Sequence, residues 1–301
     1  MRAATAWLLD APIYVFRAWF GMPDAWRDNN ERRLSAAIGF TNTILGLLEQ
    51  IDPGDPFLAA FDESLGTNFR NEIFSGYKMN RTQADPELVF QFETCKELLL
   101  ELGIPSFSGP RYEADDYIAT LSAIYHQAGY KIRIITRDKD LSQLIVGNEI
   151  TCFDPISGKV TDESTFKKEY LISPFQLPDL IGLVGDSVDD IPGVPGIGKK
   201  TAATLLCEYE SLEGLQERIS RDFQLEMRGG RRIKKLLKEN WDKALMSREL
   251  ARVCKSIPDI RLEQTSSRSA VNFKVLESLL VGWNAPNSLL VRCGKLANTC
   301  A

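Results

Sequence analysis

The chain has 301 residues, of which 44% are hydrophobic and 26% are charged, and its net charge is −5. This composition is typical of a folded protein of one or two domains, and no apolar run approaches the length of about 18 residues that a membrane-spanning helix requires. Asp10 and Arg17 interrupt the apolar start of the chain, so we also expect no signal peptide.

Histidine and cysteine narrow the chemistry further. His126 is the single histidine, which leaves little room for Ser-His-Asp catalysis or a histidine-rich zinc site. The six cysteines are scattered and form no Cys-x-x-Cys pair, so neither a zinc knuckle nor a disulfide framework is indicated. We therefore expect a protein of the reducing cytoplasm whose chemistry depends on carboxylates, lysines or a bound metal.

Short apolar strands alternate with amphipathic helices in the first half of the chain. Apolar runs that end at an acid predict buried strands at 5–10, 57–62 and 131–138. Apolar residues at three- and four-residue spacing predict helices at 16–20, 33–51, 85–104 and 112–129. This alternation indicates an α/β fold with a mostly parallel central sheet flanked by helices.

The pattern changes near residue 160. Residues 151–161 are predicted to form a hairpin, and a further helix is expected to begin at DLSQLI, after the third strand. Beyond residue 163 the chain consists of short helical segments joined by Pro/Gly turns. We therefore divide the chain into an α/β domain at 1–160 and a helical region at 161–301.

Acidic side chains follow the three predicted strands. Asp10, Asp62 and Asp138 each stand at the carboxyl end of a strand, which is where sites form in parallel sheets. One such acid is commonly a helix cap, but three on neighbouring strands would meet in one crevice. Further acids lie in YEADD, RDKD and GDSVDD, namely Glu113, Asp115, Asp116, Asp140, Asp186 and Asp189.

So many carboxylates in one crevice require cations to offset their charge. Oxygen ligands of this kind suit Mg²⁺, which Mn²⁺ can replace, better than zinc. Two such ions about 3.5–4 Å apart would stabilise the attacking and leaving oxygens of a phosphodiester displacement. The acids therefore predict metal-assisted hydrolysis of a phosphodiester, with solvated surface acids as the alternative.

IPGVPGIGKKTA, at residues 191–202, is typical of a helix-hairpin-helix, which we place at about 180–207. Its glycines allow backbone amides to approach a phosphate, and its lysines start the second helix. We expect DNA contacts from Gly196, Gly198, Lys199, Lys200 and Thr201. A Walker A loop is excluded because Lys200 occupies its Ser/Thr position and no strand precedes it.

Cations lie beside the predicted acidic crevice. In NFRNEIFSGYKMNR, we expect Arg70, Lys78 and Arg81 to position a phosphate, and Tyr77 to stack on a terminal base. Arg17 is a further expected DNA contact. The segment 218–255 is rich in arginine and lysine and predicts a nucleic-acid surface, with a solvated helix face as the alternative.

Taken together, these motifs resemble the 5'-nuclease (flap endonuclease) family, in its bacterial and phage branch. The resemblance runs from about Trp7 to about Leu206 and rests on FDES with its downstream FR and GYK, YEADD, RDKDLSQL and GDSVDDIPGVPGIGKKTA. It implies a 5'→3' exonuclease or 5'-flap endonuclease acting by a two-metal mechanism in DNA replication or repair. The implied substrates are 5' flaps, nicks and free 5' ends, and we expect a monomer that works with a DNA polymerase.

The resemblance also implies roles for individual residues. Lys78, Arg81 and Asp116 would be catalytic, the first two at the base of a helical arch near 70–105. K⁺ would bind backbone carbonyls of the hairpin, at Val194, Pro195 and Ile197. A first metal group would comprise Asp10, Asp62, Glu113 and Asp115, and a second Asp138, Asp140, Asp186 and Asp189.

Two departures from the family pattern stand out. Asp190 replaces the usual Asn, and Ala-Pro instead of Gly follows Asp10. Neither removes an expected ligand. Two other readings remain: a structure-specific DNA-binding protein with weak or no catalysis, and a ribonuclease built on a similar sheet.

Overall fold

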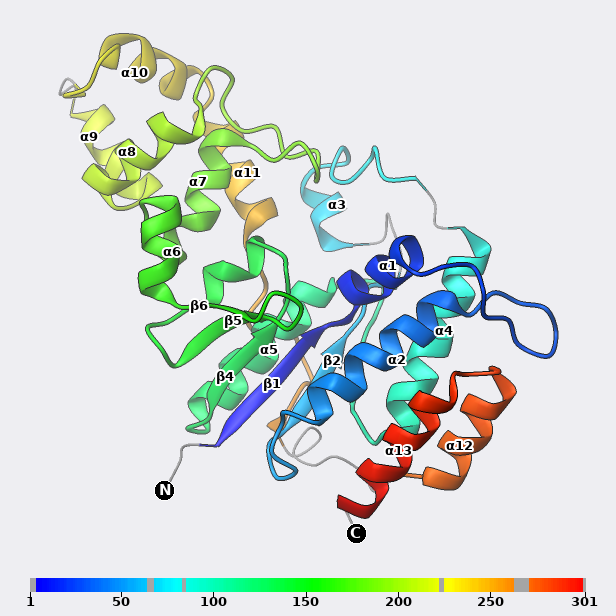
Figure 1. Ribbon diagram of the computed structural model, residues 1–301. Helices are drawn as coiled ribbons and strands as arrows, with labels where there is room; N and C mark the ends of the chain where they lie inside the picture. The colour runs from blue at the N-terminus through cyan, green and yellow to red at the C-terminus, as the bar shows by residue number, and fades with distance from the viewer. Residues whose placement is uncertain (1–3, 64–67, 83–84, 222–224, 263–270, 300–301) are drawn as a thin grey trace.

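A computed structural model describes residues 4–63, 68–82, 85–221, 225–262 and 271–299. Its core is a six-stranded sheet in the order β3-β2-β1-β4-β5-β6, parallel except for the final β5–β6 hairpin (Figure 1). The strands are β1 (Thr5–Asp10), β2 (Phe57–Ala60), β3 (Ser106–Phe107), β4 (Lys131–Ile135), β5 (Ile150–Asp154) and β6 (Lys159–Thr161). The predicted strands and hairpin are confirmed, and the short edge strand β3 is an addition.

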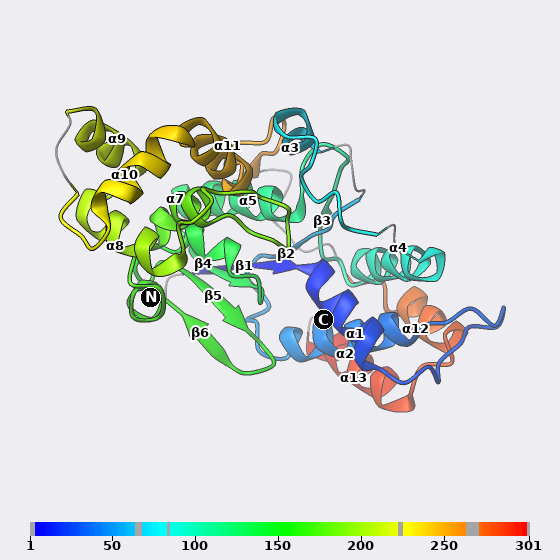
Figure 2. The same cartoon turned by 90° about the horizontal axis from the view of Figure 1, so that it is seen from above.

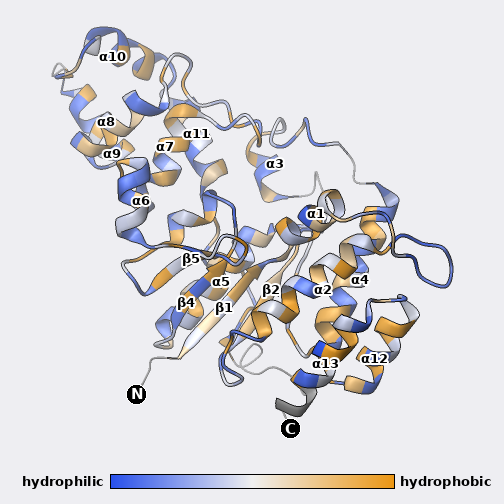
Figure 3. Cartoon of the chain, viewed as in Figure 1, coloured by the Kyte–Doolittle hydropathy of each residue, from blue (hydrophilic) through white to orange (hydrophobic). Residues whose placement is uncertain are grey.

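Helices cover the sheet on two faces. On one face α1, α2 and α4 pack over Leu9 and Ala59, and on the other α5 packs over Leu8 and Ile134. The bounds are α1 (Ala11–Gly21), α2 (Ser35–Leu48), α4 (Pro86–Glu101) and α5 (Ala114–Gln127). In Figure 3 the central strands are mostly hydrophobic and the outer loops hydrophilic, as burial on both sheet faces requires. The predicted fold class is therefore confirmed.

Local sequence fixes where these helices begin. The Asp85 carboxylate accepts a hydrogen bond from the Glu87 amide at 2.8 Å, and Pro86 occupies the first turn of α4. Pro12 likewise starts α1 directly after β1, so this helix is longer than the predicted 16–20 segment. The helix expected after the third strand is instead the short 3₁₀ helix η1 (Asp140–Leu144).

Short helices form a layer beyond one end of the sheet (Figures 1 and 2). α11 lies along α7, and α8 packs against both α7 and α9. The small α3 (Phe69–Ile73) also contacts α11. The other bounds are α6 (Glu163–Tyr170), η2 (Pro174–Gln176), α7 (Leu177–Val184), α8 (Lys199–Tyr209), α9 (Leu212–Ser220), α10 (Gly230–Glu239) and α11 (Trp241–Ala251).

The last two helices, α12 (Phe273–Gly282) and α13 (Asn287–Thr299), return to the first half of the chain. They pack on α4 and α2, where Leu276 and Leu280 join the same buried core as Leu9, and Arg292 pairs with Glu49 at 2.7 Å (Figure 2). The boundary near residue 160 stays a prediction. Within the described residues, no helix has the length and apolarity to span a membrane.

Candidate active site

The strand-end acids meet as the sequence predicts. β1 lies between β2 and β4, so Asp10, at the last residue of β1, has Asp62 on one side and Asp138 on the other. Asp10 is 3% exposed, and its carboxylate accepts a hydrogen bond from the Thr136 hydroxyl at 2.7 Å. Burial, together with the charges of Asp138 and Asp62, raises the pKa of Asp10 to about 8.

The first turn of α5 supplies the next two acids. The Ala114 amide donates to the Asp62 carboxylate at 2.8 Å, which places the start of this helix beside the end of β2. Burial and the neighbouring charges of Asp138 and Asp10 raise the pKa of Asp115 well above its usual value. Asp115 follows Ala114 in the first turn of α5 and therefore lies near the end of β2, and Glu113 stands at the N-cap of this helix.

A second acidic group lies beside the first. Burial and the charge of Asp138 raise the pKa of Asp140 to about 7, with smaller contributions from Asp186 and Asp189. Asp186 is held through its backbone, which exchanges hydrogen bonds with Ile191 at 2.8 and 2.7 Å. The two acidic groups expected from the sequence are therefore adjacent in space.

Three cations point into these acids. Lys78 Nζ lies 2.6 Å from Glu113 Oε1 and 3.7 Å from Asp189 Oδ2. Arg81 pairs with Asp189 at 2.6 Å, as expected for residues that flank the crevice. Although burial opposes it, the charge of Lys78 and then of Arg70 lowers the pKa of Glu113.

The third cation, Lys139, was not predicted. Its Nζ lies 2.6 Å from Asp186 Oδ2. Burial opposes ionisation of Asp186, but the hydrogen bonds from Lys139 and from the Val188 amide outweigh it and lower the pKa. The position of Lys139 between Asp138 and Asp140 in RDKD was the available signal.

The oxygen-only donor set fits a hard divalent cation. Burial is the main cause of the raised pKa values of Asp10 and Asp140, and neighbouring carboxylates add to it, so a cation bound among these acids would stabilise their ionised forms. In the described part of the chain, no three His, Cys, Asp or Glu side chains form a preformed metal-binding group. Glu113, Asp186 and Asp189 instead pair with Lys78, Lys139 and Arg81.

Arg70 and Asp116 correct the sequence prediction. Arg70 was expected to contact DNA and Asp116 to be catalytic, but they are 2% and 0% exposed and form a bidentate pair at 2.7 and 2.8 Å. Arg70 also donates to the carbonyls of Leu250 and Arg252. This pair is structural, because it joins α3 and α5 to the end of α11 and leaves no atom free for a phosphate.

Tyr77 is also misassigned as a base-stacking residue. Its side chain is 4% exposed, and its hydroxyl donates to Glu113 Oε2 at 3.0 Å. Since its ring packs within the protein, with Lys78 Nζ 5.0 Å from the ring centre, neither face is open to a base. Tyr77 orients Glu113 instead.

The predicted helix-hairpin-helix is formed by α7, the loop after it, and α8. Gly193 has a φ of +60°, and a Cβ atom there would lie 2.2 Å from the Gly185 nitrogen, so no larger residue fits. Gly196, Gly198 and Lys200 are exposed. Lys199 is exposed too, with its Nζ 4.3 Å above the ring of Tyr170. The hairpin therefore presents backbone and lysines outward, as a phosphate contact requires.

The potassium prediction concerns the same turn. The Val194 carbonyl accepts a hydrogen bond from the Ile197 amide at 3.1 Å, while Pro195 is exposed. The role of these carbonyls, like that of Thr201 at the start of α8, stays a prediction.

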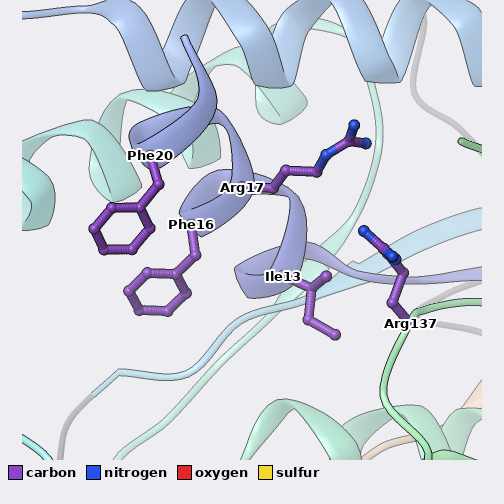
Figure 4. Close-up of a pocket in the computed structure, with 5 residues that line it drawn as sticks. All are labelled: Ile13, Phe16, Arg17, Phe20 and Arg137. Carbon is purple, nitrogen blue, oxygen red and sulfur yellow. The ribbon is translucent and has the colours of Figure 1, made fainter.

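An aromatic pocket on α1 opens beside the crevice. Figure 4 shows Phe16 and Phe20 pointing to the same side of this helix, while Arg17 extends from its opposite side and Arg137 comes from a neighbouring loop. Phe16 is 41% and Phe20 80% exposed. Aromatic faces next to cations are the kind of surface on which bases can stack and phosphates can bind. Phe16 and Phe20 were not singled out from the sequence, although their four-residue spacing places them on one side of a helix.

A basic surface extends from the hairpin onto α10. The buried residues of α10 are Gly230, Ile233 and Leu237, whereas Arg231, Arg232 and Lys235 are exposed. A Cβ on Gly196 would lie 3.2 Å from the guanidinium of Arg232, which places α10 next to the hairpin. Not every cation of 218–255 belongs to this surface, because Arg248 is buried and pairs with Glu213 at 2.5 Å.

Comparison with known proteins identifies the family. Residues 5–173 match the N-terminal resolvase-like domain of 5'-3' exonucleases, and residues 172–272 match their C-terminal SAM fold. The chain is 32% identical over 257 residues to the 5'-3' exonuclease of Buchnera aphidicola subsp. Acyrthosiphon pisum, covering 85% of this chain and 89% of that one. The chain therefore belongs to the 5'-3' exonuclease family.

Two further relatives extend the comparison. DNA polymerase I of Bacillus subtilis is 36% identical over 257 residues, which cover 83% of this chain but only 28% of the polymerase. The bacteriophage T5 D15 flap endonuclease, solved in a complex with DNA and metal ions, superposes with a TM-score of 0.63 at 18% identity, covering 98% of this chain and 99% of that one. At that identity the likeness shows a shared fold.

Proposed function

We propose that the chain cleaves DNA at 5' ends and at the base of 5' flaps, as a divalent-metal-dependent nuclease of replication or repair. The observation that carries this proposal is the meeting of Asp10, Asp115 and Asp138 in one crevice, flanked by Lys78 and Arg81. Family membership and the fold shared with a flap endonuclease support it.

Two groups of acids would hold the metal ions, with Mg²⁺ as the proposed metal and Mn²⁺ as its substitute. When bound, the ions would supply the positive charge that activates water and stabilises the leaving oxygen. The first group is Asp10, Asp62, Glu113 and Asp115, and the second is Asp138, Asp140, Asp186 and Asp189.

The remaining side chains bind and orient the substrate. Lys78 and Arg81 would move from Glu113 and Asp189 onto the scissile phosphate, because a phosphate offers them charge-assisted hydrogen bonds of the same kind. Phe16 and Phe20 would stack the bases next to that phosphate, and Arg17 would hold the strand. The hairpin and α10 would grip the duplex, with K⁺ at the hairpin carbonyls.

We further propose that the protein acts as a monomer in the bacterial cytoplasm and cooperates with a DNA polymerase. The relatives that are DNA polymerase I carry the matching segment within a much longer chain. A separate polymerase partner would then do what those relatives combine in one polypeptide.

Removal of the metal should abolish cleavage without abolishing binding. We expect a 5'-labelled flap duplex to be cut near the flap junction in Mg²⁺ or Mn²⁺, and to remain intact in EDTA, with product length measured on a denaturing gel. DNA binding without cleavage in every metal would instead favour a structure-specific binding protein. Preferential cleavage of a matched RNA strand would favour the ribonuclease.

Neutralising α10 should weaken binding through loss of phosphate contacts. Replacing Arg231, Arg232 and Lys235 by Gln should reduce the slope of log K against log salt by about 2–3, since each phosphate contact contributes about 0.9 to that slope. Fluorescence anisotropy on the flap duplex measures it. The matched control replaces Lys131, Lys274 and Lys295 by Gln, on surfaces away from the hairpin, and should leave the slope unchanged. Equal slopes for both triple variants would remove α10 from the DNA-binding surface.

A further inference from the structure

The turn that carries Lys78 and Arg81 is fastened to the loop after α7. The Asp190 carboxylate accepts hydrogen bonds from the Asn80 backbone N–H at 2.9 Å and from the Asn80 side-chain amide. The Lys78 backbone N–H donates to the Asp189 carbonyl at 3.0 Å. Asn80 and Asp190 are 110 residues apart in the sequence, so these contacts are purely tertiary.

Backbone conformation shows that the turn needs this restraint. Lys78 has a φ of +53° and Asp190 a φ of +56°, both in the left-handed region. Asp tolerates this region comparatively well, but for Lys it costs on the order of 1 kcal/mol. A strained backbone of this kind persists only where the surrounding structure holds it. The hydrogen bonds to Asp189 and Asp190 are among the restraints on this turn, together with the hydrogen bond from the Asn71 side-chain amide to the Tyr77 carbonyl at 3.0 Å.

The strained turn sets the direction of two functional side chains. From it, Lys78 Nζ reaches Glu113 Oε1 at 2.6 Å, and Arg81 reaches Asp189 Oδ1 at 2.6 Å. Relaxation of Lys78 to a negative φ would redirect the chain on either side of it. We therefore propose that Asp190 is a positioning residue, whose hydrogen bonds to Asn80 keep Lys78 and Arg81 aimed into the acidic crevice.

The proposal rests on the proposed nuclease function, because cleavage is its main readout. It gives a residue outside both acidic groups a way to affect the reaction, because displacement of a positioned group by about 1 Å can cost about 100-fold in rate. The same contacts couple the turn to the loop that carries Asp186 and Asp189, so both sides of the crevice are set together.

Kinetics of Asp190 variants on the 5'-flap duplex test the proposal. We expect Asp190→Ala to lower kcat by about 10-fold or more with KM within about twofold, because substrate binding elsewhere is intact. Asp190→Asn, which keeps one acceptor oxygen and tolerates positive φ, should retain most of the activity. Glu72→Ala, which removes an exposed carboxylate bonded to Arg111, is the matched control and should leave kcat unchanged.

A double variant separates positioning from a general structural effect. In a Lys78→Ala/Arg81→Ala background, adding Asp190→Ala should change kcat less than twofold, because the groups that it positions are already gone. If Asp190→Ala lowers kcat by the same factor in this background as in the wild type, the proposal is overturned. Full kcat in the Asp190→Ala single variant would also overturn it. Circular-dichroism melting should show that each variant is folded.

Hydrogen exchange tests the contact without any chemistry. In Asp190→Ala the amides of Lys78 and Asn80 should exchange faster than in the wild type, while those of α5 should not change. If the wild-type protein fails to cleave the flap duplex, the proposed nuclease function is wrong. The exchange rates of the Lys78 and Asn80 amides then show by themselves whether Asp190 restrains the turn. Cleavage by the wild type with unchanged exchange in Asp190→Ala would overturn the role of Asp190 alone.

Discussion

Asp115→Asn should abolish cleavage and, at the same time, stabilise the metal-free protein. The substitution keeps the shape of the side chain but removes one charge from the centre of the crevice. We expect the cleavage rate in Mg²⁺ to fall by at least about 1,000-fold, because the residues of such a site act as a unit. Flap-DNA binding, measured by anisotropy in EDTA, should persist.

The gain in stability follows from the raised pKa of Asp115. Burial and the charges of Asp138 and Asp10 disfavour its ionised form in the folded protein. Its contribution to stability is therefore present at low pH and is lost as the pH rises above the unfolded value near 4. In EDTA at pH 8, Asp115→Asn should raise the free energy of unfolding by about 1–2 kcal/mol, and at pH 5 by less.

A matched substitution tests whether removing one carboxylate charge anywhere on the protein has the same effect. Asp162→Asn removes a charge from the N-cap of α6, where Asn caps as well as Asp, and should change neither cleavage nor stability appreciably. Denaturant unfolding at both pH values measures the comparison. Full activity of Asp115→Asn, or a loss of stability at pH 8, would contradict the placement of Asp115 in the acidic crevice.

Arg70→Met should destabilise the fold and leave the intrinsic affinity for DNA unchanged. The substitution removes the partner of Asp116, which is completely buried, and leaves a carboxylate with uncompensated charge. We expect the free energy of unfolding to fall by about 3–5 kcal/mol, measured in urea. The carbonyls of Leu250 and Arg252 lose a donor as well.

Two comparisons make this result specific. Arg81→Met removes a cation that is 39% exposed, so it should cost stability little, by about 1 kcal/mol or less, while slowing cleavage. In Arg70→Met/Asp116→Leu the loss should be clearly smaller than the sum of the two single losses, because no unpaired charge is left buried. A stable Arg70→Met protein with weakened DNA binding would restore Arg70 to the DNA surface.

The three cations of NFRNEIFSGYKMNR show where the sequence stops being informative. Arg70, Lys78 and Arg81 are equivalent there, as basic residues near a predicted crevice. The structure buries Arg70 against Asp116 and the end of α11, and aims Lys78 and Arg81 at the acids. The partners of Arg70 lie 46, 180 and 182 residues away, and no local pattern encodes such contacts.

Lys139, Phe16 and the last two helices illustrate the same limit. The sequence places Lys139 beside two acids but cannot show that it pairs with Asp186, which a different element supplies. Phe16 lies in a predicted helix, where an apolar residue is expected to be buried, and only the structure shows that its side chain is 41% exposed. The return of α12 and α13 onto α2 and α4 depends on which apolar faces remain uncovered after the rest of the chain has packed.

The sequence by itself determined the α/β alternation, the strand-end acids and the helix-hairpin-helix. These features have short-range signatures: apolar runs of strand length, helical periodicity, and glycines where the backbone needs positive φ. Parallel strands align their carboxyl ends, but the strand order that places β1 between β2 and β4, and so brings Asp10, Asp62 and Asp138 together, was decided by the tertiary structure. Only the tertiary structure decided which charged residues are buried pairs and which face the crevice, because burial and pairing depend on segments distant in the chain.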